Sequence, residues 1–226
     1  MRFLLRHWYD LGLALAIATL VWQAFAQYDG LRLILLLNLV VISLHQYEEY
    51  HWPGGGPWMI NVVLGTKDAT VDRYPLNQLN ALLNNFVLWL LYLLPVIWPE
   101  TIWHGLGAVL VGFGQLFAHG VQCNIKLKTW YNPGLATVII GHVPLGIWYL
   151  VEVYRNDLIS GWDWVGAIAY VLVVMGIIVG VGFVLMGNKT SPHPFAREEL
   201  VRSNAVRHLT RLGIALPEAL LPESHA

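Results

Sequence analysis

One short polar run, His45-Gln46-Tyr47-Glu48-Glu49, lies within an otherwise apolar part of the sequence. At helical spacing, Glu48 lies about 60° to one side of His45 and Glu49 about 40° to the other. An imidazole and carboxylates on one helix face suit a divalent cation such as Zn, Fe or Mn. An ionised side chain within a membrane costs about 2.5–3.5 kcal/mol, so paired carboxylates there need a counter-charge. The run therefore predicts a metal site; the alternative is that both glutamates only reach the lipid headgroups.

Other apolar segments carry polar residues that could complete such a site. Gln115 and His119 share one narrow helix face, so His119 is the expected second histidine ligand. Stripes of this kind also form hydrogen bonds between membrane helices, which is their simplest role. We expect the remaining polar side chains to orient the ligands or the substrate: Asn38, Asn77, Asn80, Asn84, Gln115 and His142.

The composition indicates which elements position these residues. Of the 226 residues, 57% are hydrophobic and only 12% are charged, whereas a soluble domain has roughly 25% charged residues. Six apolar runs are long enough to cross a membrane, at residues 10–27, 31–52, 77–98, 101–123, 134–153 and 163–187. The sequence therefore predicts an all-α integral membrane protein with a bundle of six transmembrane helices. A net charge of -1 without a basic block argues against nucleic acid as a partner.

The positive charges predict the orientation of the bundle. With the N-terminus inside, the cytoplasmic segments hold 11 of the 13 Lys and Arg residues, and the other side holds only Arg32 and Arg155. Both termini are then cytoplasmic. The first run has an alternative interpretation as a cleavable signal peptide, because Arg2 and Arg6 precede the apolar core and Ala24-Phe25-Ala26 follows it.

We expect residues 1–187 to form the transmembrane domain and residues 188–226 to form a cytoplasmic tail. Within the connection from Trp52 to Leu76, the stretch Pro53-Gly54-Gly55-Gly56-Pro57 should interrupt helix formation. The tail is expected to contain one short amphipathic helix that ends at Gly213. A solvated tail is favoured over docking on the membrane surface. The apolar face of this helix would comprise Val201, Ala205, Leu209 and Leu212.

The predicted topology brings the histidines to one depth in the membrane. His45 lies about 21 Å along its helix from the outer end at Leu31, and His119 lies about 27 Å from Thr101. His142 lies about 12 Å along a helix that rises from the cytoplasmic side, so it can approach the same level. We therefore expect a polar chamber near the cytoplasmic leaflet.

The pattern His45-x-x-Glu48-Glu49, followed by a membrane histidine and Tyr131-x-Pro133-Gly134, resembles the HXXEE domain family of integral membrane proteins. The resemblance extends over roughly residues 31–150. It implies that His119, or His142 in its place, belongs to a site shared by the family. It implies no particular reaction.

We expect the chain to be a metal-dependent membrane enzyme that acts on a lipid or another amphiphile, with hydrolysis as the simplest reaction. His45, His119 and one glutamate of the pair would bind the ion, and the other glutamate would act as general base. Tyr131 would donate a hydrogen bond to an oxyanion. A small proton- or ion-coupled transporter and a non-catalytic membrane partner protein are the alternatives. Membrane lipids are the expected partners, and the bacterial inner (plasma) membrane is the expected location.

Overall fold

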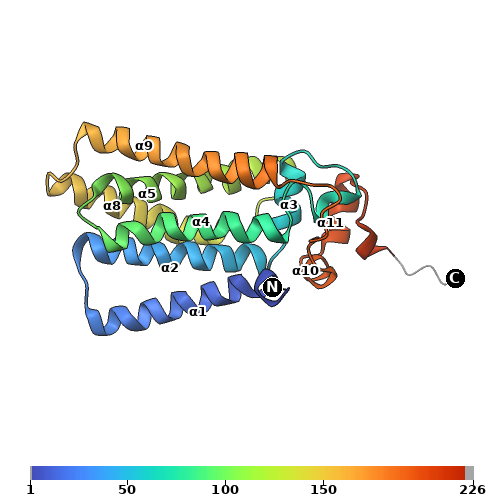
Figure 1. Cartoon of the computed structure of the whole chain (residues 1–226), viewed down its shortest axis with the longest axis horizontal. Coiled ribbons are helices and arrows are strands. Elements are labelled where there is room, and N and C mark those ends of the chain that lie inside the picture. Colours follow the sequence, from blue (N-terminus) through green and yellow to red (C-terminus); the bar gives the residue numbers. More distant parts are fainter. Residues whose placement is uncertain (1, 222–226) are drawn as a thin grey trace.

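Six long helices form the body of the protein in a computed structural model that describes residues 2–221 (Figure 1). All six are long and apolar enough to cross a membrane, and the described residues contain no strand. The six spans are α1 (Arg2–Ala26), α2 (Gly30–Tyr50), α4 (Gln78–Ile97), α5–η2–α6 (Ile102–Leu127), α7–η3–α8 (Leu135–Arg155) and α9–η4 (Gly161–Leu185). The prediction of a six-helix all-α membrane protein is thereby confirmed.

The first and fourth spans are longer than the sequence predicted. Helix α1 already begins at Arg2, because Leu5 and Trp8 near its start are buried. The ring of Trp8 packs edge-on against Tyr50 at the end of α2 and against Trp89 of α4. The fourth span continues to Leu127. The start of α1 and the tail helices lie at the same end of the bundle (Figure 1).

Two asparagines expected at the site instead cap α4. The side chain of Asn77 accepts hydrogen bonds from the backbone N–H groups of Leu79 and Asn80. The Asn80 side chain accepts a hydrogen bond from the backbone N–H of Asn77 at 2.7 Å, and its NH2 group donates to the Gly182 carbonyl at 2.8 Å. This capping box occupies the otherwise unpaired N–H groups of the first helical turn. Asn77 and Asn80 therefore begin α4 and fasten it to the last span.

Three spans contain a π-helical segment, near the start of the fifth span and toward the end of the fourth and the last. The segments are η2 (Ala118–Cys123), η3 (Val138–His142) and η4 (Ile177–Leu185). A π-helical segment shifts the direction of the following side chains, and such segments are frequent at functional sites. Here η2 contains His119 and η3 contains His142.

The end of the bundle that carries the tail is covered by short helices. They are α3 (Gly56–Val63), η1 (Ala69–Asp72), α10 (Arg197–Arg202), α11 (Ala205–Leu212) and η5 (Glu218–Leu220). Helix α3 can begin at Gly56 because Pro57 occupies its first turn, where no N–H partner is required. Trp58 of α3 is buried against Leu200 and Leu209 of the tail, and its indole N–H donates to the Ser203 hydroxyl at 3.0 Å.

The described part of the tail therefore packs on the bundle end with two helices where one was expected. Asn204 separates α10 from α11 and has a left-handed backbone with φ of 53°. Because the helix is interrupted at Asn204, α10 does not continue the predicted apolar face. Leu200 is buried in place of Val201, which is 49% exposed. Gly213 ends α11 in the left-handed conformation, as its sequence position predicted.

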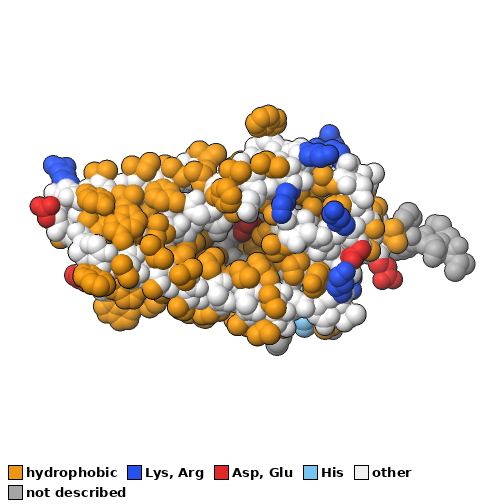
Figure 2. All heavy atoms as spheres, turned by 90° about the horizontal axis from the view of Figure 1, so that it is seen from above, with side chains coloured by type: hydrophobic (Ala, Val, Ile, Leu, Met, Phe, Trp, Pro, Cys, Tyr) orange, Lys and Arg blue, Asp and Glu red, His pale blue; other side chains and the backbone are white. Residues whose placement is uncertain are grey.

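The surface of the bundle is apolar along the length of the spans. Leu172, Val184 and Ile140 are each more than 60% exposed, and the visible face carries hydrophobic side chains over most of its length (Figure 2). Most of the Lys and Arg side chains on this face lie at the end with the tail. Exposed apolar area on this scale indicates contact with lipid. The interior is packed mainly by aliphatic side chains and by Tyr149, for example around Ile34 and Leu106.

Candidate metal centre

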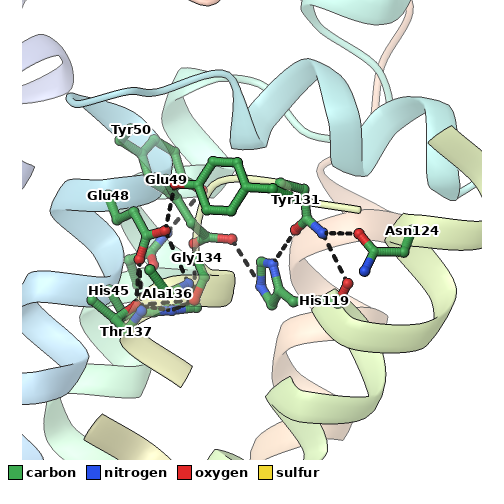
Figure 3. A network of polar contacts seen from close by, with 12 residues as sticks. His45, Glu48, Glu49, Tyr50, His119, Asn124, Tyr131, Gly134, Ala136 and Thr137 are labelled. Carbon is green, nitrogen blue, oxygen red and sulfur yellow. Dashed lines mark hydrogen bonds and ion pairs between the residues drawn. The ribbon is translucent and has the colours of Figure 1, made fainter. Parts of the chain in front are cut away.

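Two histidines and one glutamate from two spans meet near the end of α2 that carries the HXXEE-like run. Nε2 of His119 lies 3.4 Å from Glu49 Oε1, and Nε2 of His45 lies 3.8 Å from Glu49 Oε2. All three residues are buried, and one potential ligand atom from each lies within 4.8 Å of the others. Figure 3 shows the Glu49 carboxylate pointing toward His119. The predicted ligands His45 and His119 are thus brought together with Glu49.

The backbone of the fifth span fixes the protonation of His45. Its Nδ1 lies 3.1 Å from the carbonyl oxygen of Gly134 and 3.0 Å from the hydroxyl of Thr137. A carbonyl only accepts hydrogen bonds, so Nδ1 carries the proton. In the neutral ring the lone pair is therefore on Nε2, which faces Glu49 and has no hydrogen-bond partner among the described residues.

A chain of amides fixes His119 in the same way. Nδ1 of His119 lies 2.6 Å from Asn132 Oδ1. The orientation of this amide is set by its own NH2 group, which donates to the carbonyl of His119 at 2.8 Å and to Asn124 Oδ1 at 2.9 Å. Asn132 Oδ1 must therefore accept the hydrogen bond, and His119 donates it from Nδ1. In the neutral ring its Nε2 lone pair also faces Glu49.

With both rings neutral, the centre contains three acceptors and no donor. Two imidazole lone pairs and a carboxylate that face one another repel unless a cation lies between them. Ligand atoms about 2.1 Å from a tetrahedral ion are roughly 3.4 Å apart. The 3.4 Å between His119 Nε2 and Glu49 Oε1 equals this spacing, and the 3.8 Å between His45 Nε2 and the other oxygen, Oε2, is somewhat longer. Two histidines and one carboxylate also leave one position of a four-coordinate ion open.

The neighbouring Glu48 is occupied by hydrogen bonds from the fifth span and the loop before it. Oε1 accepts from the Tyr131 hydroxyl at 2.9 Å and from the Ala136 N–H at 3.2 Å. Oε2 accepts from the backbone and the hydroxyl of Thr137, at 2.9 and 2.7 Å. A carboxylate at a helix N-terminus is stabilised by the unpaired N–H groups and by the helix dipole. Glu48 thus holds the start of the fifth span and is not among the three grouped ligands.

Tyr131 is committed to Glu48, although the sequence suggested an oxyanion donor. Its hydroxyl donates to Glu48, and the ring is half-exposed in the loop before the fifth span. Burial and the contact with Glu48 raise the pKa of the Tyr131 hydroxyl, so it stays protonated as a donor. Its hydroxyl reaches Glu48, the sequence neighbour of Glu49, as the dashed line in Figure 3 marks. Its place is therefore at the edge of the candidate centre.

His142 lies next to the centre but outside the group of three. Its ring centroid is 5.6 Å from that of His45 and 5.5 Å from that of Tyr92. His142 is 1% exposed, and neither of its ring nitrogens has a hydrogen-bond partner in the described part of the chain. The Tyr92 hydroxyl is likewise buried and unpartnered. These two residues extend the polar interior away from His45, Glu49 and His119.

The remaining polar residues expected at the centre have other surroundings. Asn38 is buried and donates to the Ile34 carbonyl of its own helix at 3.1 Å. Gln115 lies on a partly exposed face of α5 and forms no side-chain hydrogen bond with the described residues. The Asn84 amide is buried and unpartnered, close to Gly182 of the last span. None of these three contacts the ligands through a hydrogen bond.

The sequence reasoning missed three residues that orient the ligands: Asn132, Gly134 and Thr137. Gly134 has φ of 100°, and a Cβ there would lie 2.8 Å from His45 and 2.5 Å from His119. A glycine is therefore required for the backbone to approach both rings. The Tyr131-x-Pro133-Gly134 turn was the available signal, since it contains Asn132 and Gly134 and ends directly before the fifth span.

Residues 36–149 match a family described as proteins of unknown function with an HXXEE motif. The chain belongs to the HXXEE family. The matched region contains all three grouped ligands, Glu48 and the turn that orients the histidines. It begins within α2 and ends within α8 (Val143–Arg155), so all of the first span and all of the last span lie outside it. Neither the curated proteins nor the solved structures yielded a match.

Proposed function

We propose that this HXXEE protein is a metal-dependent membrane hydrolase whose ion is held by His45, Glu49 and His119. The observation that carries the proposal is that both Nε2 lone pairs and the Glu49 carboxylate face one another, with each Nδ1 committed elsewhere. Hydrogen bonds at Nδ1 orient ligand histidines in metal sites and increase their basicity. A divalent ion in this position would supply a Lewis acid that activates water near neutral pH.

The hydrogen bonds divide the work between the two glutamates. Glu48 is occupied by four donors, whereas Glu49 accepts no hydrogen bond from the described residues. We therefore assign both carboxylate roles to Glu49: one oxygen binds the ion, and the other acts as the general base that accepts a proton from water. The hydroxyl of that water joins the substrate carbonyl or phosphorus, and the proton passes to the departing oxygen.

The surroundings of the centre favour an amphiphilic substrate. The ligands belong to membrane spans, and Glu49 is only 6% exposed. The apolar face in Figure 2 contains a hollow in which an acidic side chain is visible. A lipid ester or phosphoester can bring its polar bond to such a depth while its acyl chains stay in the bilayer. We further propose that the centre serves the cytoplasmic leaflet of a bacterial inner membrane, because 11 of 13 Lys and Arg residues belong to the segments at this end.

The test begins with the metal content of detergent-purified protein, measured by inductively coupled plasma mass spectrometry. Wild-type protein should contain about one divalent ion per chain, and His119→Gln should lose it. His104→Gln is the matched control, since His104 lies near the opposite end of the same span. The same three proteins are then incubated with phospholipids and lysolipids, and released fatty acids and headgroups are identified by mass spectrometry.

We expect wild type and His104→Gln to release product, and His119→Gln to release none. A chelator should abolish the release, and added metal should restore it. Folded wild-type protein that binds no divalent ion would overturn the metal centre. A metal-loaded protein that hydrolyses none of these amphiphiles would overturn the hydrolase assignment. Metal-free protein that moves protons into liposomes would favour the transporter alternative.

A further inference from the structure

A second polar feature lies at the same end of the bundle and takes no part in the metal centre. A cavity of about 450 Å³ is bordered by three lysines, Lys67, Lys126 and Lys128. Its other walls are mainly apolar and include Val63, Leu212 and Ile214. No acidic residue borders the cavity. Three positive charges therefore surround a space with an apolar lining.

The lysines come from separate elements that the fold draws together. Lys67 follows α3, Lys126 lies in the last turn of the fourth span, and Lys128 ends that span with a left-handed backbone at φ of 51°. The ammonium of Lys126 donates to the Val63 carbonyl at 2.6 Å, which joins α6 (Asn124–Leu127) to α3. Arg211 donates to the Leu127 carbonyl at 3.0 Å and holds α11 against the same helix end.

The charges of these lysines are not neutralised within the described part of the chain. None of the three forms an ion pair there. The nearest acidic residue in sequence, Asp68, pairs with Lys189 at 2.6 Å. Like charges around one cavity repel one another, and an anion between them removes that repulsion. The lysine cavity is thus electrostatically suited to an anion.

The neighbouring side chains indicate that the lysine cavity lies at the level of the lipid headgroups. Ile125 is 71% exposed and Trp130 is 95% exposed, on either side of Lys126 and Lys128 in the sequence. Exposed Trp residues near the end of a span are typical of the membrane interface, and lysine side chains reach from there to the phosphates. A soluble anion would gain nothing from the apolar walls, whereas the glycerol and upper acyl groups of a lipid would.

We propose that the lysine cavity binds the phosphate headgroup of an anionic phospholipid. Basic pockets between membrane helices on the cytoplasmic side are suited to anionic headgroups, and that leaflet is where we place this end of the bundle. The lipid phosphate would lie between the ammonium groups, and its glycerol would contact Val63 and Ile214. Lys126 follows His119 by seven residues, about 10 Å along the same span. The proposal does not require that the neighbouring centre binds a metal.

The test compares two double variants that remove the same charge from the same end of the protein. Lys67→Gln with Lys128→Gln alters the cavity and spares Lys126, whose ammonium joins two helices. Arg6→Gln with Arg207→Gln is the matched control, because both side chains are exposed and lie outside the cavity. Each protein is placed in phosphatidylcholine nanodiscs with increasing phosphatidylglycerol, and retained lipids are counted by native mass spectrometry.

We expect wild type and the control to retain one phosphatidylglycerol, and the cavity variant to bind it at least about tenfold more weakly. Lys67→Arg with Lys128→Arg should restore binding. If both double variants lost phosphatidylglycerol binding equally, the binding would depend only on general surface charge, and the proposal would be overturned. Displacement of the lipid by millimolar inorganic phosphate would also overturn it, since the cavity would then recognise free phosphate. Thermal unfolding of each variant confirms that the proteins compared are folded.

Discussion

Replacing each glutamate of the HXXEE motif by glutamine should affect two different properties of the protein. Glu49→Gln removes the charged ligand from the three facing acceptors. Loss of a group that only orients a ligand weakens metal binding by about 10–100-fold, so loss of the ligand itself should exceed about 100-fold. In the metal-free protein the Glu49 carboxylate faces two imidazole nitrogens whose lone pairs repel it, so the metal-free variant should be at least as stable as metal-free wild type.

Glu48→Gln should produce the opposite pattern. A glutamine retains one carbonyl oxygen, which can still accept from Thr137, but its NH2 group then faces the donors of Tyr131 and Ala136. Tyr131 is half-exposed, so its hydroxyl can turn to water, whereas the Ala136 N–H lies in a membrane span. One unpaired donor costs about 1–3 kcal/mol. That loss lowers the unfolding temperature by roughly 2–4 °C per kcal/mol for a chain of this length.

Thermal unfolding with and without metal, followed by tryptophan fluorescence, measures both effects. A metal at 100 times its dissociation constant adds about 2.7 kcal/mol of stability. Wild type and Glu48→Gln should show this increase, from different starting temperatures, and Glu49→Gln should not. The division between the two glutamates would be refuted if both variants lost the metal equally, or if Glu48→Gln lost it without being destabilised.

Three further predictions concern the residues around the centre and the charges at the bundle end. Asn132→Ala removes the acceptor that orients His119, so metal affinity measured by competition with a coloured chelator should fall about 10–100-fold; an unchanged affinity would show that Asn132 has no such role. Gly134→Ala forces a Cβ against both histidines at φ of 100°, so metal content and unfolding temperature should both fall, whereas Gly114→Ala, which has open space and a helical backbone, should be neutral or slightly stabilising. Hydrogen bonds from Lys189 and Thr70 lower the pKa of Asp68 from 3.8 to about 2, so its contribution is present above pH 4 and disappears as the pH falls toward 2. Because Asp68 is exposed, Asp68→Asn should lower stability at pH 7 by less than about 1 kcal/mol in chemical unfolding, and a larger loss would show a role beyond the surface pair.

The sequence was sufficient for the membrane spans because their signal depends on length and composition alone. About 20 apolar residues bounded by charge, Pro or Gly are required whatever the neighbouring helices do. It also indicated His45 and His119 as site residues, since burying an ionisable side chain within a membrane span costs free energy and such residues usually have a functional role. The exact helix ends were harder to predict from the sequence. Trp8 extends α1 through contacts with Tyr50 and Trp89, which lie far away in the sequence.

The asparagine stripe shows why the roles of polar residues were harder to predict. Asn77, Asn80 and Asn84 share a helix face, which suggested a common role at the centre. Asn77 and Asn80 also lie three residues apart at the start of an apolar run, which is the spacing of a capping box. The capping interpretation was therefore available from the sequence, and it accounts for their contacts. The role of Asn132 was not available in this way, because it depends on a loop folding back against His119.

The adjacency of the two glutamates has a geometric cause. Residues three and four positions after His45 lie on opposite sides of it around the helix, about 60° one way and 40° the other. Glu48 therefore faces the start of the fifth span, while Glu49 faces His119 of the fourth. His45 itself contacts the carbonyl of Gly134. Gly134 lies in the turn directly before the fifth span, and Glu48 caps the helix that begins there. By fixing the start of the fifth span, the Glu48 carboxylate thus also positions the Gly134 carbonyl. That carbonyl accepts the Nδ1 proton of His45 and so directs the Nε2 lone pair toward Glu49. A change at Glu48 should reach the metal only through this turn, whereas a change at Glu49 acts on it directly.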